Sequence, residues 1–378
     1  MNRVKAALGS LGAAFGGYHI IDCGPDHPTR AAVVTFDLEV CQGAVTQAHI
    51  ALGRMHRGAE ELFETRDYRQ ILALVNRHDW QAPIFGELLL AELVEDALGM
   101  QIPVRAQWIR LLLAEQTRLA AHLAQLGFLE YRMGNSGAVA RVRERLRQAN
   151  LALTGNRVHP MFVRIGGVAA DVPADWPAAD RELLRDVELV LDSLKALAGD
   201  VRWLSTGAGL ARLTPAAIDA HGIAGPAAAA SGVDLDLRRL APRHPYQEVD
   251  CWSSPAAGAG GDVVARFDRW LVEASDCVSA ARAALTRLAA SPPGGTRVRA
   301  PQVIRLPEGN YHHRILAPYG IAGIHLTSRG EKTPWRLRLR TPSFANVSAL
   351  PQLLIGCPVD RLDVVIASLG FVAGDLEK

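Results

Sequence analysis

The segment LFETRDYRQILALVNRHDW, residues 62–80, places many charged and titratable side chains inside an otherwise apolar helical pattern. Its polar end consists of Asn76, Arg77, His78 and Asp79. On an exposed helix face these side chains would simply be solvated. If residues 71–75 are buried, however, the polar end enters the protein interior, where charged groups persist mainly when they are paired or functional. The segment is therefore the first candidate for a functional site.

Motifs for nucleotide, metal and nucleophilic chemistry are missing elsewhere in the sequence. IGGVAAD at residue 165 has two adjacent glycines without the spacing of a Walker or dinucleotide-binding loop. No H-E-x-x-H occurs, and His312 and His313 would point to opposite faces of a strand, which disfavours a shared metal. No G-x-S-x-G marks a nucleophile elbow, so a stand-alone hydrolase has little support beyond composition.

The cysteines are scattered, and no C-x-x-C pair could hold zinc or an iron–sulfur cluster locally. They are Cys23, Cys41, Cys251, Cys277 and Cys357. An odd number of widely spaced thiols is typical of a reducing cytoplasm. We therefore expect this chain to bind no metal or other cofactor itself.

The composition is that of a globular protein with a large core, since 49% of the 378 residues are hydrophobic and 21% are charged. The net charge of +2 gives no electrostatic reason to bind a polyanion, so nucleic acid is not expected as a partner. Residues 6–21 are uncharged and superficially imitate a secretory signal. Their glycines weaken the apolar segment, which favours a flexible N-terminal extension instead. No later window approaches ~18 apolar residues, so the chain is not expected to span a membrane.

Alternating residues predict a hairpin near the N-terminus and a second pair of strands near the C-terminus. Residues 31–40 alternate apolar and polar side chains, Gly43 permits a turn, and a returning strand starts at Val45. In residues 321–340, a polar turn separates two strands, and arginines alternate with leucines in the second. We interpret that arginine face as solvated or facing a partner.

Helical periodicity dominates from residue 59 to residue 153. The longest apolar pattern, residues 105–127, predicts a core helix that starts after Pro103 and ends at Gly127. Glu115 and His122 fall on its leucine face, and we interpret them as hydrogen-bonded packing residues rather than ligands. Further helices are expected after Pro177 and from Val263.

Over nearly its whole length the chain resembles the D subunit of proton-translocating NADH-quinone oxidoreductase, respiratory complex I. The resemblance lies in the segments CGPDHP, GRMHRGAEELFETRDYRQ, NRHDW, RAQWIRLLLAEQTRLAAHLAQLG, NRVHPMFVRIGGV, ASGVDLDLRR, SRGEKTPWRLRLRTPSFAN and VVIASLGFVAGDLEK. NRHDW together with SRGEKTP is most similar to the actinobacterial type, here as a divergent paralogue. More distantly, the chain resembles the large subunit of nickel-iron hydrogenases, whose two C-x-x-C motifs are replaced here by NRHDW and IASLGFVAG. Without thiolates that soft-metal site is lost.

The resemblance implies an α+β fold like that of the nickel-iron hydrogenase large subunit. The expected parts are a flexible extension (1–21), an N-terminal β-hairpin subdomain (22–55), a central helical bundle (56–220) and a C-terminal α+β part (221–378). The old metal pocket becomes a quinone cavity beside an iron–sulfur subunit. The implied partners are the iron–sulfur B subunit, the C subunit and the membrane H subunit of complex I, on the cytoplasmic face of the plasma membrane. Quinone is the implied substrate, the cluster belongs to the neighbouring subunit, and the isolated chain is expected to be inactive.

The resemblance also implies site residues. The quinone-cavity candidates are His27, Ala31, His78, Asp79, Trp80 and Arg132, and Arg77 and His159 are expected near the terminal cluster, with no residue assigned as catalytic. By analogy, a cation and a titratable imidazole beside the cluster favour its reduced state and couple its charge to a proton.

The sequence departs from its family where the quinone headgroup is held. Members typically use the second histidine of a G-P-x-H-P-x-x-H-G loop, a tyrosine, and an aspartate behind the histidine. Here the loop reads GPDHPTRAA, so these positions fall on Ala31, Trp80 and Arg132. Ala31 offers no proton and the indole of Trp80 does not titrate near neutral pH. His27 and His78 could substitute; a non-catalytic scaffold in a complex I-like or hydrogenase-like membrane assembly is the alternative.

Overall fold

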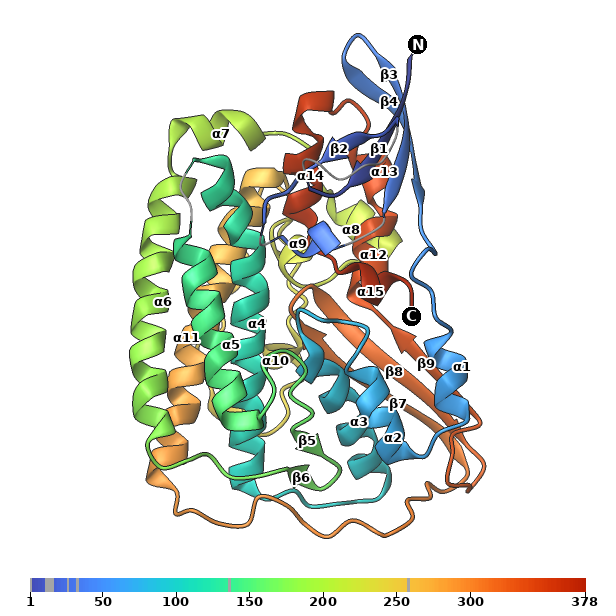
Figure 1. Ribbon diagram of the computed structural model, residues 1–378, viewed down its shortest axis with the longest axis vertical. Coiled ribbons are helices and arrows are strands. Elements are labelled where there is room, and N and C mark those ends of the chain that lie inside the picture. Colours follow the sequence, from blue (N-terminus) through green and yellow to red (C-terminus); the bar gives the residue numbers. More distant parts are fainter. Residues whose placement is uncertain (1, 11–16, 26, 32–33, 135–136, 257–258) are drawn as a thin grey trace.

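The computed structural model of the chain describes residues 2–10, 17–25, 27–31, 34–134, 137–256 and 259–378, apart from the side chains of residues 30 and 31. Figure 1 shows a helical bundle along one side, a sheet with short helices along the other, and the N-terminal sheet at one end. The described part of the chain contains no helix that is both long and apolar enough to cross a membrane.

The N-terminal sheet has the strand order β2-β1-β3-β4. Its strands are β1 (Asn2–Leu8), β2 (His19–Ile21), β3 (Thr35–Cys41) and β4 (Ala44–Ala51), and β3 and β4 form the predicted hairpin. The prediction of a flexible extension over residues 1–21 is wrong for β1 and β2. The reason is that β1 pairs antiparallel with β3, which satisfies the backbone groups of that strand and buries Ala6 and Leu8. Residues 11–16 of that extension lie outside the described residues.

The bundle consists of long helices that pack along one another. They are α4 (Val104–Arg132), α5 (Ala138–Thr154), α6 (Trp176–Ala198) and α11 (Val263–Ala290). The bundle therefore extends beyond the predicted range 56–220, because α11 presents a buried apolar stripe that packs against α4. Helix α4 begins after Pro103 as predicted but continues through Gly127 to Arg132, since Leu126 and Phe128 are buried on either side of the glycine.

The second sheet has the order β7-β8-β9 and is antiparallel throughout. Its strands are β7 (Gly309–Ala317), β8 (Gly320–Ser328) and β9 (Arg336–Arg340). The alternating pattern predicted β8 and β9, whereas β7 was not predicted. His312 is exposed and His313 is buried, so the two histidines do point to opposite faces. Figure 1 shows α1 (Ala59–Glu64), α2 (Tyr68–Val75) and α3 (Pro83–Ala97) beside this sheet, and α3 contacts β7 and β8.

Short elements connect these layers. They are η1 (Pro28–Ala31), β5 (Val163–Arg164), β6 (Gly167–Val168), α7 (Val201–Gly207), α8 (Pro215–His221), α9 (Pro226–Ala229), α10 (Leu237–Leu240), η2 (Tyr246–Glu248), α12 (Pro342–Ser348), α13 (Leu350–Leu353), η3 (Val359–Arg361), α14 (Leu362–Leu369) and α15 (Ala373–Leu376). The C-terminal helices α12 and α15 lie between the N-terminal sheet and the second sheet in Figure 1, and α14 lies beside the N-terminal sheet on the side of the bundle. This position brings the end of the chain to the loop between α2 and α3.

Candidate functional site

The loop between α2 and α3 holds the polar residues 76–80, and the carboxyl group of Asp79 fixes its turn. Asp67 caps the start of α2 by accepting hydrogen bonds from two backbone N–H groups. Asp79 Oδ1 accepts from the N–H groups of Gln81 and Ala82, at 3.0 Å each, just before α3 begins at Pro83. Gly86 allows the two helices to approach, because a Cβ there would lie 2.0 Å from the carbonyl oxygen of Val75.

The loop meets the C-terminal segment through a buried histidine–aspartate pair. His78 Nδ1 lies 2.7 Å from Asp375 Oδ1, and the carboxylate is 1% exposed. The other carboxylate oxygen accepts from the backbone N–H of Ser343 at 3.2 Å. Since a carboxylate accepts, Nδ1 donates, which leaves His78 Nε2 buried without a partner among the described residues. The pair therefore keeps one ring nitrogen available for a further proton contact.

Asp79 is buried next to this pair, and its proton affinity reflects that. Burial, and then the carboxylate of Asp375, raise the pKa of Asp79 to about 7. His78 and the backbone N–H groups of Gln81 and Ala82 lower this pKa, but by less. Two carboxyl groups side by side in the interior cannot both ionise without a large cost. The carboxyl group of Asp79 therefore exchanges a proton near neutral pH, where the loop meets the C-terminal segment.

His27 lies on the opposite side of this region and is fully engaged. Its Nε2 donates to Gln125 Oε1 at 2.8 Å, and its Nδ1 is 2.7 Å from the hydroxyl of Thr29. Burial lowers the pKa of His27 to about 4, so the ring is neutral at physiological pH. His27 therefore holds its turn against α4 and is not a proton donor.

Tyr319 joins the two sides. Its side chain is buried, and neither its hydroxyl nor the Gln125 side-chain nitrogen has a hydrogen-bond partner among the described residues. Burial and then the nearby carboxyl of Asp79 raise the pKa of Tyr319, while the neighbouring Gln125 opposes the shift. The hydroxyl of Tyr319 is therefore neutral at physiological pH, and both Gln125 and Asp79 affect its proton affinity.

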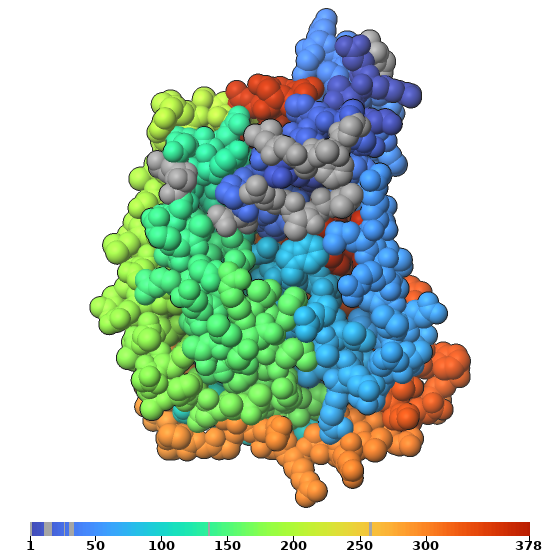
Figure 2. Space-filling model, in the orientation of Figure 1, coloured from blue at the N-terminus to red at the C-terminus, as the bar shows by residue number. Residues whose placement is uncertain are grey.

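Arg77 and His159 lie together at the surface end of the loop. His159 Nδ1 donates to Asn76 Oδ1 at 2.8 Å, and Asn76 in turn donates to the buried carboxyl of Glu87. Arg77 is exposed, and its charge, after burial, contributes to lowering the pKa of His159. Figure 2 shows that the chain around residue 155, in green, borders the chain around residue 75, in blue, on this face.

Glu87 of α3 binds the segment that follows His159. Its carboxylate accepts the backbone N–H groups of residues 161–163, each at 2.9 Å. Burial raises the pKa of Glu87 to about 7, against the effect of these N–H donors. The strand segment that follows His159 is therefore fixed to α3, which also fixes the imidazole beside Arg77.

The remaining candidates do not join the buried group. The ring of Trp80 is half-buried and packs against Gly374, where a Cβ would lie 2.3 Å away. The side chain of Arg132 is 39% exposed and pairs with Asp363 at 3.2 Å. Ala31 ends η1, and its side chain lies outside the described residues. The structure thus brings His78 and Asp79 together and leaves Arg132 at the surface.

Sequence reasoning missed Asp375, Tyr319 and Gln125. Asp375 lies 297 positions from its partner His78, so no local pattern could link them. Tyr319 and Gln125 stand in apolar surroundings that predict packing. A polar residue in an otherwise apolar segment was the only available signal. No cluster of three or more histidine, cysteine, aspartate or glutamate side chains in the described part of the chain could hold a metal ion.

Comparisons with known proteins agree on one family. The family model described as the 49 Kd subunit of respiratory-chain NADH dehydrogenase matches residues 133–304 and 297–378. The D 1 subunit of NADH-quinone oxidoreductase from Streptomyces coelicolor is 39% identical over 378 residues, which cover 99% of each chain. The D subunit of the same enzyme from Carboxydothermus hydrogenoformans is 32% identical over 361 residues, which cover 94% of this chain and 98% of the relative.

A solved structure gives the same result for the fold. It is that of the membrane-bound sulfane sulfur reductase, an archaeal respiratory membrane complex. One of its chains matches this one with a TM-score of 0.86 at 27% identity, over 92% of this chain and 95% of that one. The resemblance and the α+β fold predicted from the sequence are thereby confirmed. The chain belongs to the family of the 49 Kd subunit of respiratory-chain NADH dehydrogenase, and its full-length relatives in that family are D subunits of NADH-quinone oxidoreductases.

Proposed function

We propose that this chain is the D subunit of an NADH-quinone oxidoreductase and forms the wall of its quinone-reduction cavity beside an iron–sulfur subunit. Electrons from NADH then reach quinone with coupled proton translocation. The observation that supports this most is the buried group of His78, Asp79 and Asp375, where the α2–α3 loop meets the C-terminal segment. These two segments stand where the related hydrogenases carry their metal-binding cysteines.

Quinone reduction requires protons at a site that is buried away from solvent. Reduction of a quinone to a quinol takes two electrons and two protons, which end on the two carbonyl oxygens. The neighbouring subunit's cluster would supply the electrons. In this chain the carboxyl of Asp79 can release a proton near neutral pH, and the neighbouring His78–Asp375 pair leaves His78 Nε2 buried without a partner among the described residues. Since His27 is neutral and fully hydrogen-bonded, His78 and Asp79 are the better replacements for the lost loop histidine at Ala31.

The surface pair of Arg77 and His159 would face the cluster of the iron–sulfur B subunit. The other partners would be the C subunit and the membrane H subunit, with the chain bound peripherally on the cytoplasmic face of the plasma membrane. The isolated chain would be inactive, because it has neither electron donor nor a complete cavity wall. A divergent scaffold with a lost quinone site is the second candidate, and it is favoured by Ala31 and by the surface ion pair of Arg132.

NADH-driven quinone reduction by membranes in which this chain is the only protein of its family tests the proposal. Parallel strains carry Ala31→His, which restores the loop histidine, and Ala290→His, which adds a histidine at an exposed position at the end of α11. We expect the native chain to support activity at a rate that Ala290→His does not change. Activity that appears only with Ala31→His would establish the scaffold instead, and no activity in any strain would refute the quinone role.

A further inference from the structure

A line of buried polar side chains runs along one face of α4. Glu115, Arg118, His122 and Gln125 follow one another at intervals of three or four residues, which places them on the same face of the helix. All four are at most 1% exposed. We call these four residues the polar stripe. It lies where α4 packs against α11, in a region that the apolar pattern of the helix predicts to be dry core.

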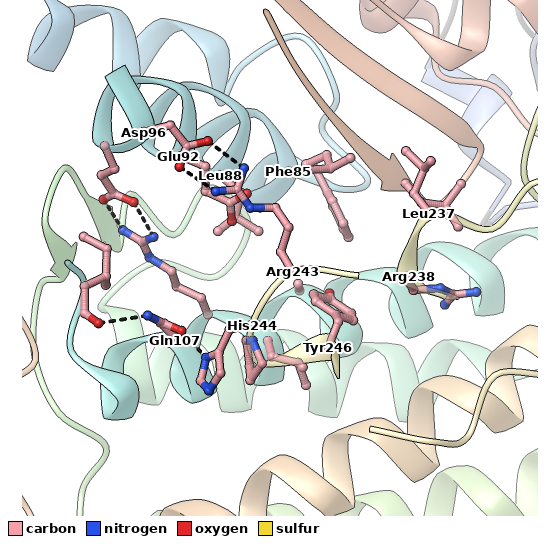
Figure 3. A pocket seen from close by; sticks show the side chains of 18 of the residues that line it. Phe85, Leu88, Glu92, Asp96, Gln107, Leu237, Arg238, Arg243, His244 and Tyr246 are labelled. Atoms are coloured by element: carbon pink, nitrogen blue, oxygen red, sulfur yellow. Dashed lines mark hydrogen bonds and ion pairs between the residues drawn. The ribbon is translucent and has the colours of Figure 1, made fainter. Parts of the chain in front are cut away.

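The outer end of the polar stripe reaches a cavity of about 300 Å³ between α3, α4, α10 and β7. Figure 3 shows this cavity, with Tyr246 on one side, Phe85 and Leu88 of α3 on the other, and the side chain of Arg243 extending to Asp96 of α3. The hydroxyl of Tyr246 donates to Glu115 Oε1 at 2.8 Å, so the wall of the cavity is bonded directly to the polar stripe. The side chain of Tyr246 therefore links solvent in the cavity to Glu115.

Charged neighbours continue the line inward. Arg118 Nε lies 3.1 Å from Glu115, and Arg238 of α10 lies 3.7 Å from Glu115 and 3.4 Å from Glu273 of α11. His122 Nε2 lies 3.7 Å from Glu273. The carboxylates of Glu115, Glu273 and Asp236 match the guanidinium groups of Arg118, Arg238 and Arg269 in number. The middle of the line is therefore electrically balanced, without an excess of cations to repel a proton.

The inner end of the polar stripe reaches the candidate site. Gln125 accepts from His27 at 2.8 Å, and its amide lies beside the hydroxyl of Tyr319, which in turn lies near Asp79. The ring of Trp270 walls this end, with its centre 5.1 Å from that of His122 and 5.8 Å from that of Tyr319. The line thus joins the cavity in Figure 3 to the buried carboxyl group.

Polar atoms without partners mark the same line. They are Arg118 Nη1, Arg238 Nη1, both ring nitrogens of His122, Gln125 Nε2 and Tyr319 Oη, none of which has a hydrogen-bond partner among the described residues. The prediction that Glu115 is a hydrogen-bonded packing residue is confirmed, whereas His122 makes no hydrogen bond within the described chain. Buried polar groups are normally satisfied, and ordered water is the usual partner where protein groups are not.

His122 is the group on the polar stripe whose charge can change. Burial lowers its pKa; Arg118 on its own helix and Arg238 on α10 add to this, and Glu273 on α11 opposes it. The imidazole is therefore neutral at rest, with a carboxylate close enough to hold it briefly as an imidazolium. A neutral ring can accept a proton on one nitrogen and release one from the other.

We propose that the polar stripe is a proton path from the cavity at Tyr246 to the buried group at Asp79. Protons pass along water held by Glu115 and the two arginines, cross His122, and reach Asp79 past Gln125 and Tyr319. The inference rests on the proposed quinone chemistry. Each quinone consumes two protons from solvent along this path, while its two electrons come from NADH through the neighbouring subunit.

The test uses the assembled complex in membranes and measures NADH-driven quinone turnover from pH 6 to pH 8.5. His122→Leu removes the imidazole of the polar stripe, and Tyr246→Phe removes one hydroxyl at its outer end. Gln116→Leu is the matched control for the first, because Gln116 is buried on α4 but bonds to Asp180 instead. Tyr311→Phe is the control for the second, since its hydroxyl bonds to the carbonyl of Pro307 on the surface.

We expect His122→Leu to lower turnover about tenfold at pH 8.5 and much less at pH 6, with KM for quinone unchanged, because protons are scarce at high pH. Tyr246→Phe should show a smaller loss with the same pH profile, and both controls should follow the unsubstituted complex. A loss that is equal at every pH and proportional to the amount of complex would mean a packing role, and would overturn the path. Unchanged turnover in both variants would overturn it as well, while the quinone role would stand. If the unsubstituted complex reduces no quinone, the proposed function fails and the path with it.

Discussion

Asp79 serves the fold and the proposed chemistry with the same carboxyl group. One oxygen accepts the N–H groups of Gln81 and Ala82 in the turn before α3, which keeps the loop in place, while burial beside Asp375 raises the pKa of the group to about 7. These two hydrogen bonds alone would favour the ionised form. The opposite shift shows that burial and the second carboxyl outweigh them. Such a conflict between local and tertiary effects is typical of functional sites.

This conflict gives Asp79 a measurable effect on stability. The folded protein keeps the proton of Asp79 up to about pH 7, whereas the unfolded chain loses it near the ordinary value of 3.8. Stability contributed by this group is therefore present below about pH 4 and is lost as the pH rises towards 7. Asp79→Asn cannot ionise and keeps an oxygen that accepts the N–H groups of Gln81 and Ala82. We expect it to be more stable than the native chain at pH 7, on the order of 1–3 kcal/mol, with no difference at pH 4.

Urea unfolding of the purified chain at several pH values measures this difference. Asp192→Asn is the control, because Asp192 is exposed on α6 and its replacement should leave the whole curve unchanged. If the free energies of unfolding of the native chain and of Asp79→Asn differ by the same amount at pH 4 and pH 7, Asp79 does not titrate in this range.

Sequence reasoning at this scale located the loop residues but not their partners. The charged end of the 62–80 segment was recognised because charge interrupts an apolar pattern, and the structure does bury Asn76 and Asp79. The chemistry of His78, however, depends on Asp375, which only the tertiary fold brings near. The ion pair of Arg132 with Asp363 likewise depends on a helix that no local pattern places beside α4.

At the scale of elements, the site depends on how closely α15 approaches the α2–α3 loop. Gly374 makes this approach possible: a Cβ there would lie 2.3 Å from the ring of Trp80 and 2.5 Å from the carbonyl oxygen of His78. The carbonyl belongs to the backbone and cannot rotate away. The distance between His78 and Asp375 is therefore set by a residue that has no side chain.

Gly374→Ala should separate the two segments. We expect a loss of about 1–3 kcal/mol in the free energy of unfolding, because the added methyl group overpacks a tight contact. The control is Gly295→Ala, at an open position in the loop before β7, which should change stability by less than about 0.5 kcal/mol. Urea unfolding of the two variants beside the native chain gives the comparison. Equal stability of all three would mean that α15 can shift without cost.

The elements themselves were largely predictable, and the misses have physical causes. Regular alternation predicted β3, β4, β8 and β9 but not β7, and Pro103 predicted the start of α4. The strands β1 and β2 were missed because the uncharged, glycine-containing residues 6–21 suggested a flexible extension, while β2 has only three residues and the alternation in β1 ends in two adjacent alanines. The prediction that α4 ends at Gly127 was wrong, because a glycine only weakens a helix and buried residues on both sides of it stabilise the helix up to Arg132.

At the scale of the whole molecule, the site has an inner and an outer side. The buried group of His78, Asp79 and Asp375 faces the interior, while Arg77 and His159 lie at the surface, where His159 bonds to Asn76 and Asn76 to Glu87. The family assignment could be made from the sequence, because long motifs occur in the right order. Which residues face inward could not, since that follows from the packing of α15, α3 and the loop. An exposed cation beside a half-buried imidazole is suited to contact with a partner that carries negative charge.

His159→Met in the assembled complex tests the outer side. Reduction of the neighbouring cluster would add negative charge and raise the pKa of His159, which burial and Arg77 otherwise lower. A proton then accompanies the electron, and the reduction potential falls as pH rises, by up to about 59 mV per pH unit for one electron. Methionine cannot take the proton, so we expect a potential that does not change with pH. Redox titration of the cluster at several pH values measures this, with His312→Met, exposed on β7, as the control that should keep the native slope. An unchanged slope in His159→Met would assign the coupled proton to another group and leave His159 with its hydrogen bond to Asn76 as its only role.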